Sequence, residues 1–163
     1  MAENRYEVEA ELNKSIALVL LRSCPIARIA YTGLDGAPRV IPVGFLWTDR
    51  TLDFWTAPTS AKVAALESDP RVAITIDTTT QPPRALLIRG VATLTTMPGV
   101  PDEYVAASMK GIPDSGRAEF TSQVRDLYDE MTCVSILPMW AKLLDFETVI
   151  PSAVAELVRN KTR

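Results

Sequence analysis

Hydrophobic residues near the start of the chain follow the spacing of a helix. Four of them recur at intervals of four residues: Val8, Leu12, Ile16 and Leu20. This spacing places them on one face of an amphipathic helix. We therefore expect a single helix over residues 6–21, which ends before Pro25 because proline cannot continue a helix.

After this helix, most of the chain alternates hydrophobic and polar residues, as strands do. The segment "GLDGAP" contains the Asp35–Gly36 pair, a strong signal for a hairpin turn. Gly90 lies inside a long strand pattern and predicts a bulge or a bend there. The expected strands cover residues 26–32, 39–48, 51–56, 71–77 and 84–95, with closing strands at 132–137 and 141–147.

Short helices are expected between and after these strands. One follows the segment "WTAPTS" and stops before Pro70, and a helical segment covers residues 101–130, interrupted by "GIPDSG". A terminal helix is expected at 152–161. Six or seven antiparallel strands joined by hairpins, with short flanking helices, favour a small β-barrel over a parallel sheet. We expect a single domain, mainly β with α, over residues 1–163.

The helix before Pro70 carries its charges at the wrong ends. Lys62 stands in its first turn, whereas Glu67 and Asp69 stand at its end, and each charge opposes the helix dipole. One interpretation is structural: Thr59 or Ser60 caps the helix and the lysine extends into solvent. The other is functional: a phosphate bound at the free backbone amides of residues 60–63 makes the lysine its partner. The segment alone leaves both interpretations open.

Composition narrows the classes of function. The formal net charge of −3 gives no basic field for nucleic acid. The polar, acidic start is unlike a signal peptide, and no apolar run is long enough for a membrane helix, so we expect a cytoplasmic protein. Cys24 and Cys133 lie far apart and predict no metal site. The chain has no histidine, which excludes histidine-based triads, zinc–histidine sites and imidazole bases.

The order of segments resembles the FMN-binding split-barrel family, which is related to pyridoxamine 5'-phosphate oxidase and to deazaflavin-dependent reductases. The matching segments are "DGAPRVIPV", a strand that ends in "FWT", then "TSAKVAALESDPRVAITI" and "LLIRGVATL". The resemblance is carried by residues 26–94. It implies a split β-barrel and a homodimer with a flavin site at the subunit interface.

The resemblance also implies which residues bind the cofactor. In the family, the strand after the first hairpin contacts the flavin ring and its phosphate-bearing chain, and the matching residues are Arg39, Val40, Ile41 and Pro42. The end of a later strand contacts the ring and the phosphate, which matches Trp55 and Thr56. The Ser–x–Lys pattern that follows binds the phosphate, which matches Ser60 and Lys62. Lys62 would then face the phosphate of FMN.

A flavin supplies its own hydride chemistry, so the missing histidine is no obstacle to such an enzyme. The expected function is FMN-dependent oxidation or reduction of a small organic substrate, with a nicotinamide as a candidate electron donor. The sequence leaves open a deazaflavin coenzyme, a non-catalytic flavin carrier or sensor, and a barrel with an empty pocket. We identify no catalytic residue. The segment 101–120 is expected to cover the flavin and to select the substrate.

Several residues keep two interpretations. Gln81 and Arg84 are candidates for contact with the polar edge of the ring, or else solvated loop residues. Pyridoxamine phosphate oxidases carry a C-terminal Arg–x–His that this chain cannot have, so oxidation of vitamin B6 is not expected. Leu144 stands where related proteins often have an aromatic residue, and Trp140 lies four residues earlier. We expect Trp47 and Trp140 to have packing roles.

Overall fold

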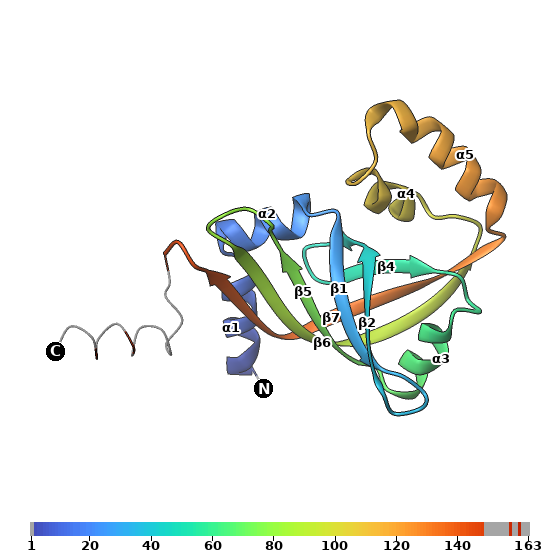
Figure 1. The fold of residues 1–163 in the computed structure, drawn as a ribbon. Coiled ribbons are helices and arrows are strands. Elements are labelled where there is room, and N and C mark those ends of the chain that lie inside the picture. Colours follow the sequence, from blue (N-terminus) through green and yellow to red (C-terminus); the bar gives the residue numbers. More distant parts are fainter. Residues whose placement is uncertain (1, 149–156, 158–159, 161–163) are drawn as a thin grey trace.

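The computed structural model describes residues 2–148, 157 and 160, and its centre is a seven-stranded antiparallel sheet (Figure 1). The strands lie in the order β2-β1-β5-β6-β7-β4-β3. Their bounds are β1 Ile26–Thr32, β2 Pro38–Gly44, β3 Leu46–Trp47, β4 Leu52–Thr56, β5 Arg71–Asp77, β6 Arg84–Pro98 and β7 Glu130–Asp145. The sheet curls into a split β-barrel with flanking helices, which confirms the predicted fold class.

The first hairpin and strand β5 follow the prediction closely. Strands β1 and β5 have the predicted bounds. In the turn between β1 and β2, Gly36 has a φ of +77°, a conformation that glycine adopts without steric cost. The Asp35 carboxylate accepts a hydrogen bond from the backbone N–H of Ala37 at 3.0 Å. The Asp–Gly pair therefore acts as the turn that the sequence predicts.

The predicted strand 39–48 is wrong in one respect, because the structure divides it into β2 and β3. Phe45 stands between the two strands and is fully buried. Strand β2 pairs with β1 at one edge of the sheet, whereas β3 pairs with β4 at the other edge. The break lets the chain cross from one edge to the other around the barrel. The alternation of hydrophobic and polar residues cannot show this break, because the chain is extended both before and after Phe45.

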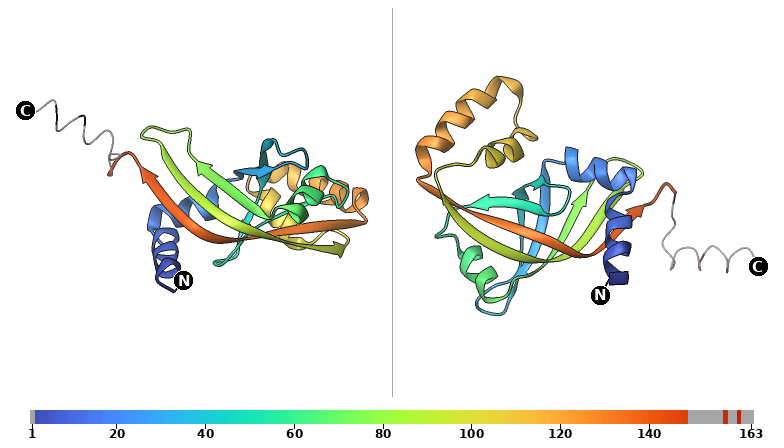
Figure 2. Two further views of the ribbon diagram at one scale, coloured as in Figure 1. Left: turned by 90° about the horizontal axis from the view of Figure 1, so that it is seen from below. Right: turned by 180° about the vertical axis from the view of Figure 1, so that it is seen from behind.

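The two predicted closing strands are also wrong, because they form one long strand, β7. This strand lies beside β6 along its whole length (Figures 1 and 2). Pro138, which lies between the two predicted strands, faces Gly90 at a register shift between Arg89 and Gly90. Proline is tolerated in a sheet at a bulge, where a hydrogen bond of the ladder is already lost. The bulge predicted at Gly90 is confirmed.

The single helix predicted over 6–21 is wrong, because the chain forms α1 (Ala2–Leu12) and α2 (Ser15–Ser23). The helices meet at Lys14, whose ψ of 140° is extended. Val8, Leu12 and Leu20 are buried as expected, so the hydrophobic spacing continues across the break. The Glu11 carboxylate accepts a hydrogen bond from the backbone N–H of Leu143 at 2.8 Å, which ties α1 to β7.

The remaining helices are α3 (Ala61–Ser68), α4 (Asp102–Met109), the 3-10 turn η1 (Asp114–Gly116) and α5 (Arg117–Leu127). Helix α3 ends two residues before Pro70, as predicted, and α4 and α5 occupy the predicted helical segment. The terminal helix predicted at 152–161 falls outside the described residues, apart from Leu157 and Asn160. None of the helices in the described part of the chain is long and apolar enough to cross a membrane.

The core lies inside the barrel and beneath α1 and α2. It is built from the inward-facing residues of the strands together with the apolar faces of these two helices. Its largest fully buried side chains include Phe45, Phe54, Leu20, Ile29 and Met131. Alternating strand residues supply this interior, and the outward-facing residues of the same strands remain for the surface hollows described below.

Candidate cofactor site

A pocket of about 410 Å³ opens where β2, β4, α3 and α4 meet. Strand β2 contributes its C-terminal half and β4 its last three residues, while one residue comes from α3 and two come from α4. The lining residues are Ile41, Pro42, Val43, Gly44, Phe54, Trp55, Thr56, Lys62, Tyr104 and Ser108. Five of them, Ile41, Pro42, Trp55, Thr56 and Lys62, are among the eight residues proposed from the sequence.

Lys62 is the one charged residue among the described residues that line the pocket. Its Nζ atom donates to Ser60 Oγ at 2.6 Å and to Thr56 Oγ1 at 3.1 Å. Both acceptors are neutral hydroxyls. Burial lowers the pKa of Lys62, because a partly desolvated amine favours its uncharged form. An anion in this pocket would stabilise the charged amine, which forms no ion pair within residues 2–148.

The side-chain contacts at the α3 N-terminus differ from those of the structural interpretation. Ser60 occupies the N-cap position, but its side chain makes no capping hydrogen bond. Its hydroxyl instead accepts from the Lys62 amine, and Lys62 is only partly exposed. In a plain N-cap, the Ser60 hydroxyl would accept a hydrogen bond from a backbone amide of the helix, and the lysine would extend into solvent. The local geometry is that of a cationic site built around the lysine.

Fewer amides are free at this helix end than the sequence suggested. The N–H of Ser60 donates to the carbonyl of Ala57 at 3.0 Å, and the N–H of Val63 donates to that of Ser60 at 2.8 Å. Amides in the first turn have no acceptor within the helix. The amides of Ala61 and Lys62 are therefore the two that a ligand could occupy.

The indole of Trp55 provides a second polar group without a partner. Its Nε1 atom is buried and has no hydrogen-bond partner in the described part of the chain. A buried N–H group without an acceptor is costly, and Trp55 is a lining residue of the pocket. The pocket therefore combines the amine of Lys62 and the hydroxyl of Thr56 with the Trp55 side chain, and the hydroxyl of Ser60 lies next to the amine just outside the lining.

The structure does not bring Arg39 and Val40 into this pocket. The Arg39 guanidinium pairs with the Asp35 carboxylate at 2.6 Å, beside the turn between β1 and β2. Val40 is 66% exposed and lines a different hollow. Val40 therefore lies outside the pocket that Ile41 and Pro42 line.

Sequence reasoning did not identify Gly44, Phe54, Tyr104 and Ser108 as site residues. Tyr104 and Ser108 lie four residues apart on α4, so they share one face of that helix. Burial raises the pKa of the Tyr104 phenol. The segment 101–120 was expected to cover a cofactor, but helical spacing alone could not show which residues turn toward the barrel.

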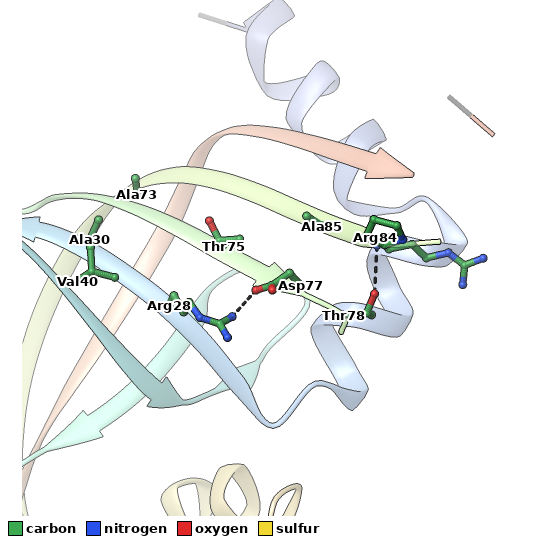
Figure 3. A pocket seen from close by; sticks show the side chains of 10 residues that line it. Arg28, Ala30, Val40, Ala73, Thr75, Asp77, Thr78, Arg84 and Ala85 are labelled. Atoms are coloured by element: carbon green, nitrogen blue, oxygen red, sulfur yellow. Dashed lines mark hydrogen bonds and ion pairs between the residues drawn. The ribbon is translucent and has the colours of Figure 1, made fainter. Parts of the chain in front are cut away.

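A second hollow, of about 480 Å³, lies on the outer face of the sheet (Figure 3). Its floor is made of small or apolar side chains from four strands, including Ala30, Val40, Ala73 and Ala85. At one end the guanidinium of Arg28 forms an ion pair with Asp77. The charges of this hollow are therefore paired internally, in contrast to the charge of Lys62.

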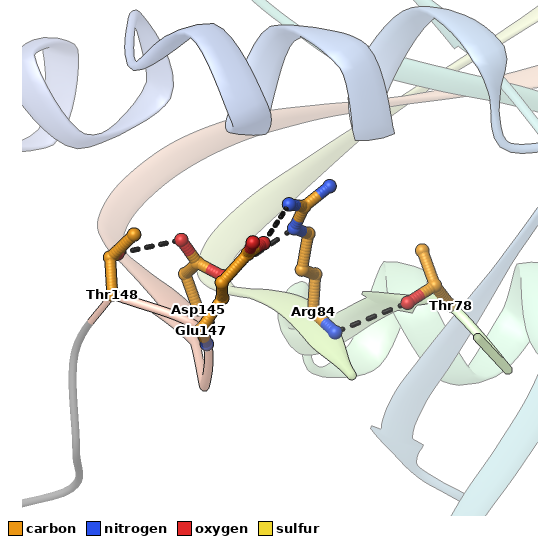
Figure 4. Close-up of polar contacts among 5 residues, drawn as sticks. All are labelled: Thr78, Arg84, Asp145, Glu147 and Thr148. Atoms are coloured by element: carbon orange, nitrogen blue, oxygen red, sulfur yellow. Dashed lines mark hydrogen bonds and ion pairs between the residues drawn. The ribbon is translucent and has the colours of Figure 1, made fainter. Parts of the chain in front are cut away.

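Arg84, a candidate for the ring edge, is also already paired (Figure 4). Its Nη2 atom lies 2.6 Å from a Glu147 oxygen, and its Nε atom lies 3.4 Å from Asp145. The hydroxyl of Thr148 donates to Asp145 at 2.6 Å and is the main reason why the pKa of that carboxyl is lowered. Gln81 is exposed. Arg84 thus joins the ends of β6 and β7 and offers no free charge in this subunit.

The tryptophans that the sequence left open lie away from the pocket. Trp140 faces Arg89 across the β6–β7 pair, with the guanidinium carbon 4.5 Å from its ring centre, which is a cation–π contact. Trp47 packs against the core. Leu144 pairs with Ala85 beside the hollow on the sheet. These contacts give both tryptophans packing roles within the subunit.

Comparison with solved structures supports the fold. The chain resembles an F420 reductase (TM-score 0.59, 19% identity, 79% of this chain and 97% of that chain). It also resembles a putative pyridoxamine 5'-phosphate oxidase from Listeria innocua (TM-score 0.55, 16% identity, 85% and 98%). A third match is a FAD-binding protein from Mesorhizobium loti (TM-score 0.51, 18% identity, 78% and 91%). At these identities the likeness concerns the fold.

The fold and the pocket define a split β-barrel protein with a pocket between β2, β4 and α3 that Lys62 lines. The chain belongs to the pyridoxamine 5'-phosphate oxidase family, because the model of that family matches residues 16–131, which include most of the barrel and the whole pocket. No curated protein matches the chain.

Proposed function

We propose that this protein is an FMN-dependent oxidoreductase that acts on a small organic substrate, and that Lys62 binds the phosphate of FMN. The observation that carries the proposal is the partly buried amine of Lys62, whose hydrogen-bond partners among the described residues are the hydroxyls of Ser60 and Thr56. Membership of the family supports the proposal. A phosphate would accept hydrogen bonds from the amine, from both hydroxyls and from the two amides of the α3 N-terminus.

The residues of the pocket fit the rest of such a cofactor. Ile41, Pro42 and Val43 on β2 offer an apolar wall, and Trp55 adds an aromatic side chain beside them. A bound flavin supplies hydride transfer, so the protein needs to position the ring and exclude water. This division of labour suits a chain with no histidine.

Two alternatives use the same pocket. A deazaflavin coenzyme would place its phosphate at Lys62 in the same way, and the match to an F420 reductase favours testing it. A flavin carrier or sensor would bind FMN without turnover. Oxidation of vitamin B6 is not part of the proposal, because the chain lacks the histidine of that substrate site.

We also propose that the working unit is a homodimer. The outer face of β1, β2, β5 and β6 carries two neighbouring hollows of about 480 Å³ that share Ala30 and Ala73. Val40 and Val91 on this face are 66% and 38% exposed. Exposed apolar side chains that gather on one face are typical of an interaction site, and a second copy could bring Arg39 or Arg84 to a flavin ring. Location in the cytoplasm stays a prediction.

The test compares FMN with riboflavin, which has the same ring and no phosphate. The protein, freed of any cofactor, is titrated with each compound, and binding is followed by flavin fluorescence. We expect FMN to bind at least tenfold more tightly, because charge-assisted hydrogen bonds are each worth about 1.5–3 kcal/mol. The variant Lys62→Met should lose most of that preference and bind riboflavin as the parent does. A parallel titration with the deazaflavin coenzyme identifies the preferred ring.

Lys142→Met is the matched control, since Lys142 is exposed on β7, and it should keep the full preference for FMN. Equal binding of FMN and riboflavin by the parent protein would contradict the phosphate site. Reduction of the bound flavin by NADPH or NADH, followed by reoxidation with an organic acceptor, separates an enzyme from a carrier. A flavin that neither donor reduces would favour the carrier.

A further inference from the structure

The helical hairpin formed by α4, η1 and α5, residues 102–127, stands at one end of the barrel (Figures 1 and 2). We call this segment the lid. Tyr104 and Ser108 of the lid form one wall of the candidate cofactor pocket. The pocket is therefore closed at this wall only while the lid packs against the barrel.

Lys110, the residue that follows α4, has an unusual environment. Its amine nitrogen is buried and has no hydrogen-bond partner in the described part of the chain. The nitrogen lies 3.7 Å from the centre of the Phe45 ring, and Phe45 is fully buried in the barrel. The amine is thus held between the lid and the barrel, where water cannot solvate it.

The backbone next to Lys110 also lies close to the barrel. A Cβ atom placed on Gly111 would lie 3.4 Å from the Cβ atom of Pro25. The amine and the backbone beside it thus both contact the rest of the fold, at Phe45 and Pro25. Burial of the amine therefore reports on docking of the lid.

The groups around the amine leave its charge uncompensated. The titratable group that interacts with it is the thiol of Cys24, at the end of α2; burial raises the pKa of this thiol, so the thiol is neutral at pH 7. From α5, Arg117 donates to the carbonyls of Met109 and Ile112, and its charge is paired with Asp114 at 2.9 Å. The Phe45 ring offers only a cation–π contact.

We propose that the lid closes over the pocket when Lys110 loses its proton, and that protonation of the buried amine loosens it. A charged amine without a partner is costly in a desolvated position, whereas the neutral amine can remain against Phe45. The lysine would thus make closure of the lid sensitive to pH. This inference holds whichever cofactor the pocket binds.

The expected pH range follows from the two states of the lysine. Burial lowers the pKa of Lys110 from its ordinary value of 10.5 to about 8 in the docked lid, while the undocked lid restores the ordinary value. Below pH 8 the amine is charged in both states and docking is weak. As the pH rises above 8, the docked state loses its proton first and is favoured. Linkage then predicts that the docking constant rises about tenfold between pH 7 and pH 9.

The experiment is hydrogen exchange of the α4 amides in the ligand-free protein, corrected for the intrinsic dependence of exchange on pH. We expect protection of α4 to rise about tenfold from pH 7 to pH 9. Lys110→Met, which is neutral and of similar length, should show high protection at both pH values. Lys110→Arg stays charged throughout and should show low protection at both. The exposed control Lys142→Met should behave like the parent.

Each result decides the proposal. Parent protection that does not change with pH, or a rise that persists in Lys110→Met, would overturn it. Titration of the Lys110 side chain by NMR in the unaltered protein provides a second measurement that needs no variant. Titration near pH 8, together with the change in α4 protection, supports the proposal, and titration near 10.5 overturns it. None of these measurements depends on FMN affinity, so their outcome is independent of the proposed function.

Discussion

Lys62 shows how a single residue can indicate a site from sequence. A lysine in the first turn of a helix opposes the dipole, and the structure gives the reason: the amine turns back to Thr56 and Ser60 and faces a pocket. Arg39, in contrast, fitted the family pattern but pairs with Asp35. The sequence could not show that pairing, because it does not reveal which way the arginine side chain points.

The charge state of Lys62 leads to a prediction about pH. Burial lowers the pKa of its amine in the ligand-free protein, and a bound phosphate would raise it again. Binding of FMN is then strongest below the lowered pKa and weakens as the pH rises through it, by up to about tenfold per pH unit. The measurement is the ratio of FMN to riboflavin affinity between pH 7 and pH 10.

Riboflavin serves as the internal control in that titration. It carries the same ring, so titration of the ring and movement of the lid affect both compounds and cancel in the ratio. The ratio should be independent of pH in Lys62→Met. A constant ratio in the parent protein over the whole range would mean that the amine does not contact the phosphate.

At the scale of elements, the sequence was sufficient to predict those strands and turns that their own residues define. The Asp35–Gly36 turn and the strands β1 and β5 could be predicted because turn residues and alternation define them. The divided helix at Lys14 and the break at Phe45 could not. In both places the hydrophobic pattern continues, and only packing against the closed barrel bends the chain.

The bulge at Gly90 leads to a prediction at this scale. A Cβ atom on Gly90 would lie 2.6 Å from the carbonyl oxygen of Leu137 and 2.7 Å from Cγ2 of Ile136. Gly90→Ala should therefore force β6 and β7 apart and lower the free energy of unfolding by about 1–3 kcal/mol. Denaturation with urea measures the change.

Gly116→Ala is the matched control, because its added Cβ atom would meet Ile112 at an ordinary 3.6 Å. It should change the unfolding free energy by a few tenths of a kcal/mol at the start of α5. A Gly90→Ala protein as stable as the parent would show that the two strands can adjust around the bulge without loss.

At the scale of the whole molecule, the pocket depends on segments that only the fold brings together. The end of β4 and the start of α3 are neighbours in sequence, so Trp55, Thr56 and Lys62 could be predicted as a group. Tyr104 and Ser108 come from about 40 residues later in the sequence, in the helical segment that connects β6 to β7. Nothing in helical spacing shows which barrel edge that helix meets.

The outer sheet face leads to the prediction that belongs to the whole molecule. Ala73 lies at the centre of that face and lines both of its hollows. If a second copy packs there, Ala73→Arg should place a bulky charge in the interface and convert a dimer into a monomer. The fold should persist, because Ala73 is exposed within one subunit. Sedimentation velocity measures the change in mass, and circular dichroism confirms the fold.

The matched control is Ala118→Arg, at an exposed site on α5, which should leave the dimer intact. A parent protein that sediments as a monomer, or an Ala73→Arg protein that remains a dimer, would place the subunit contact elsewhere or remove it.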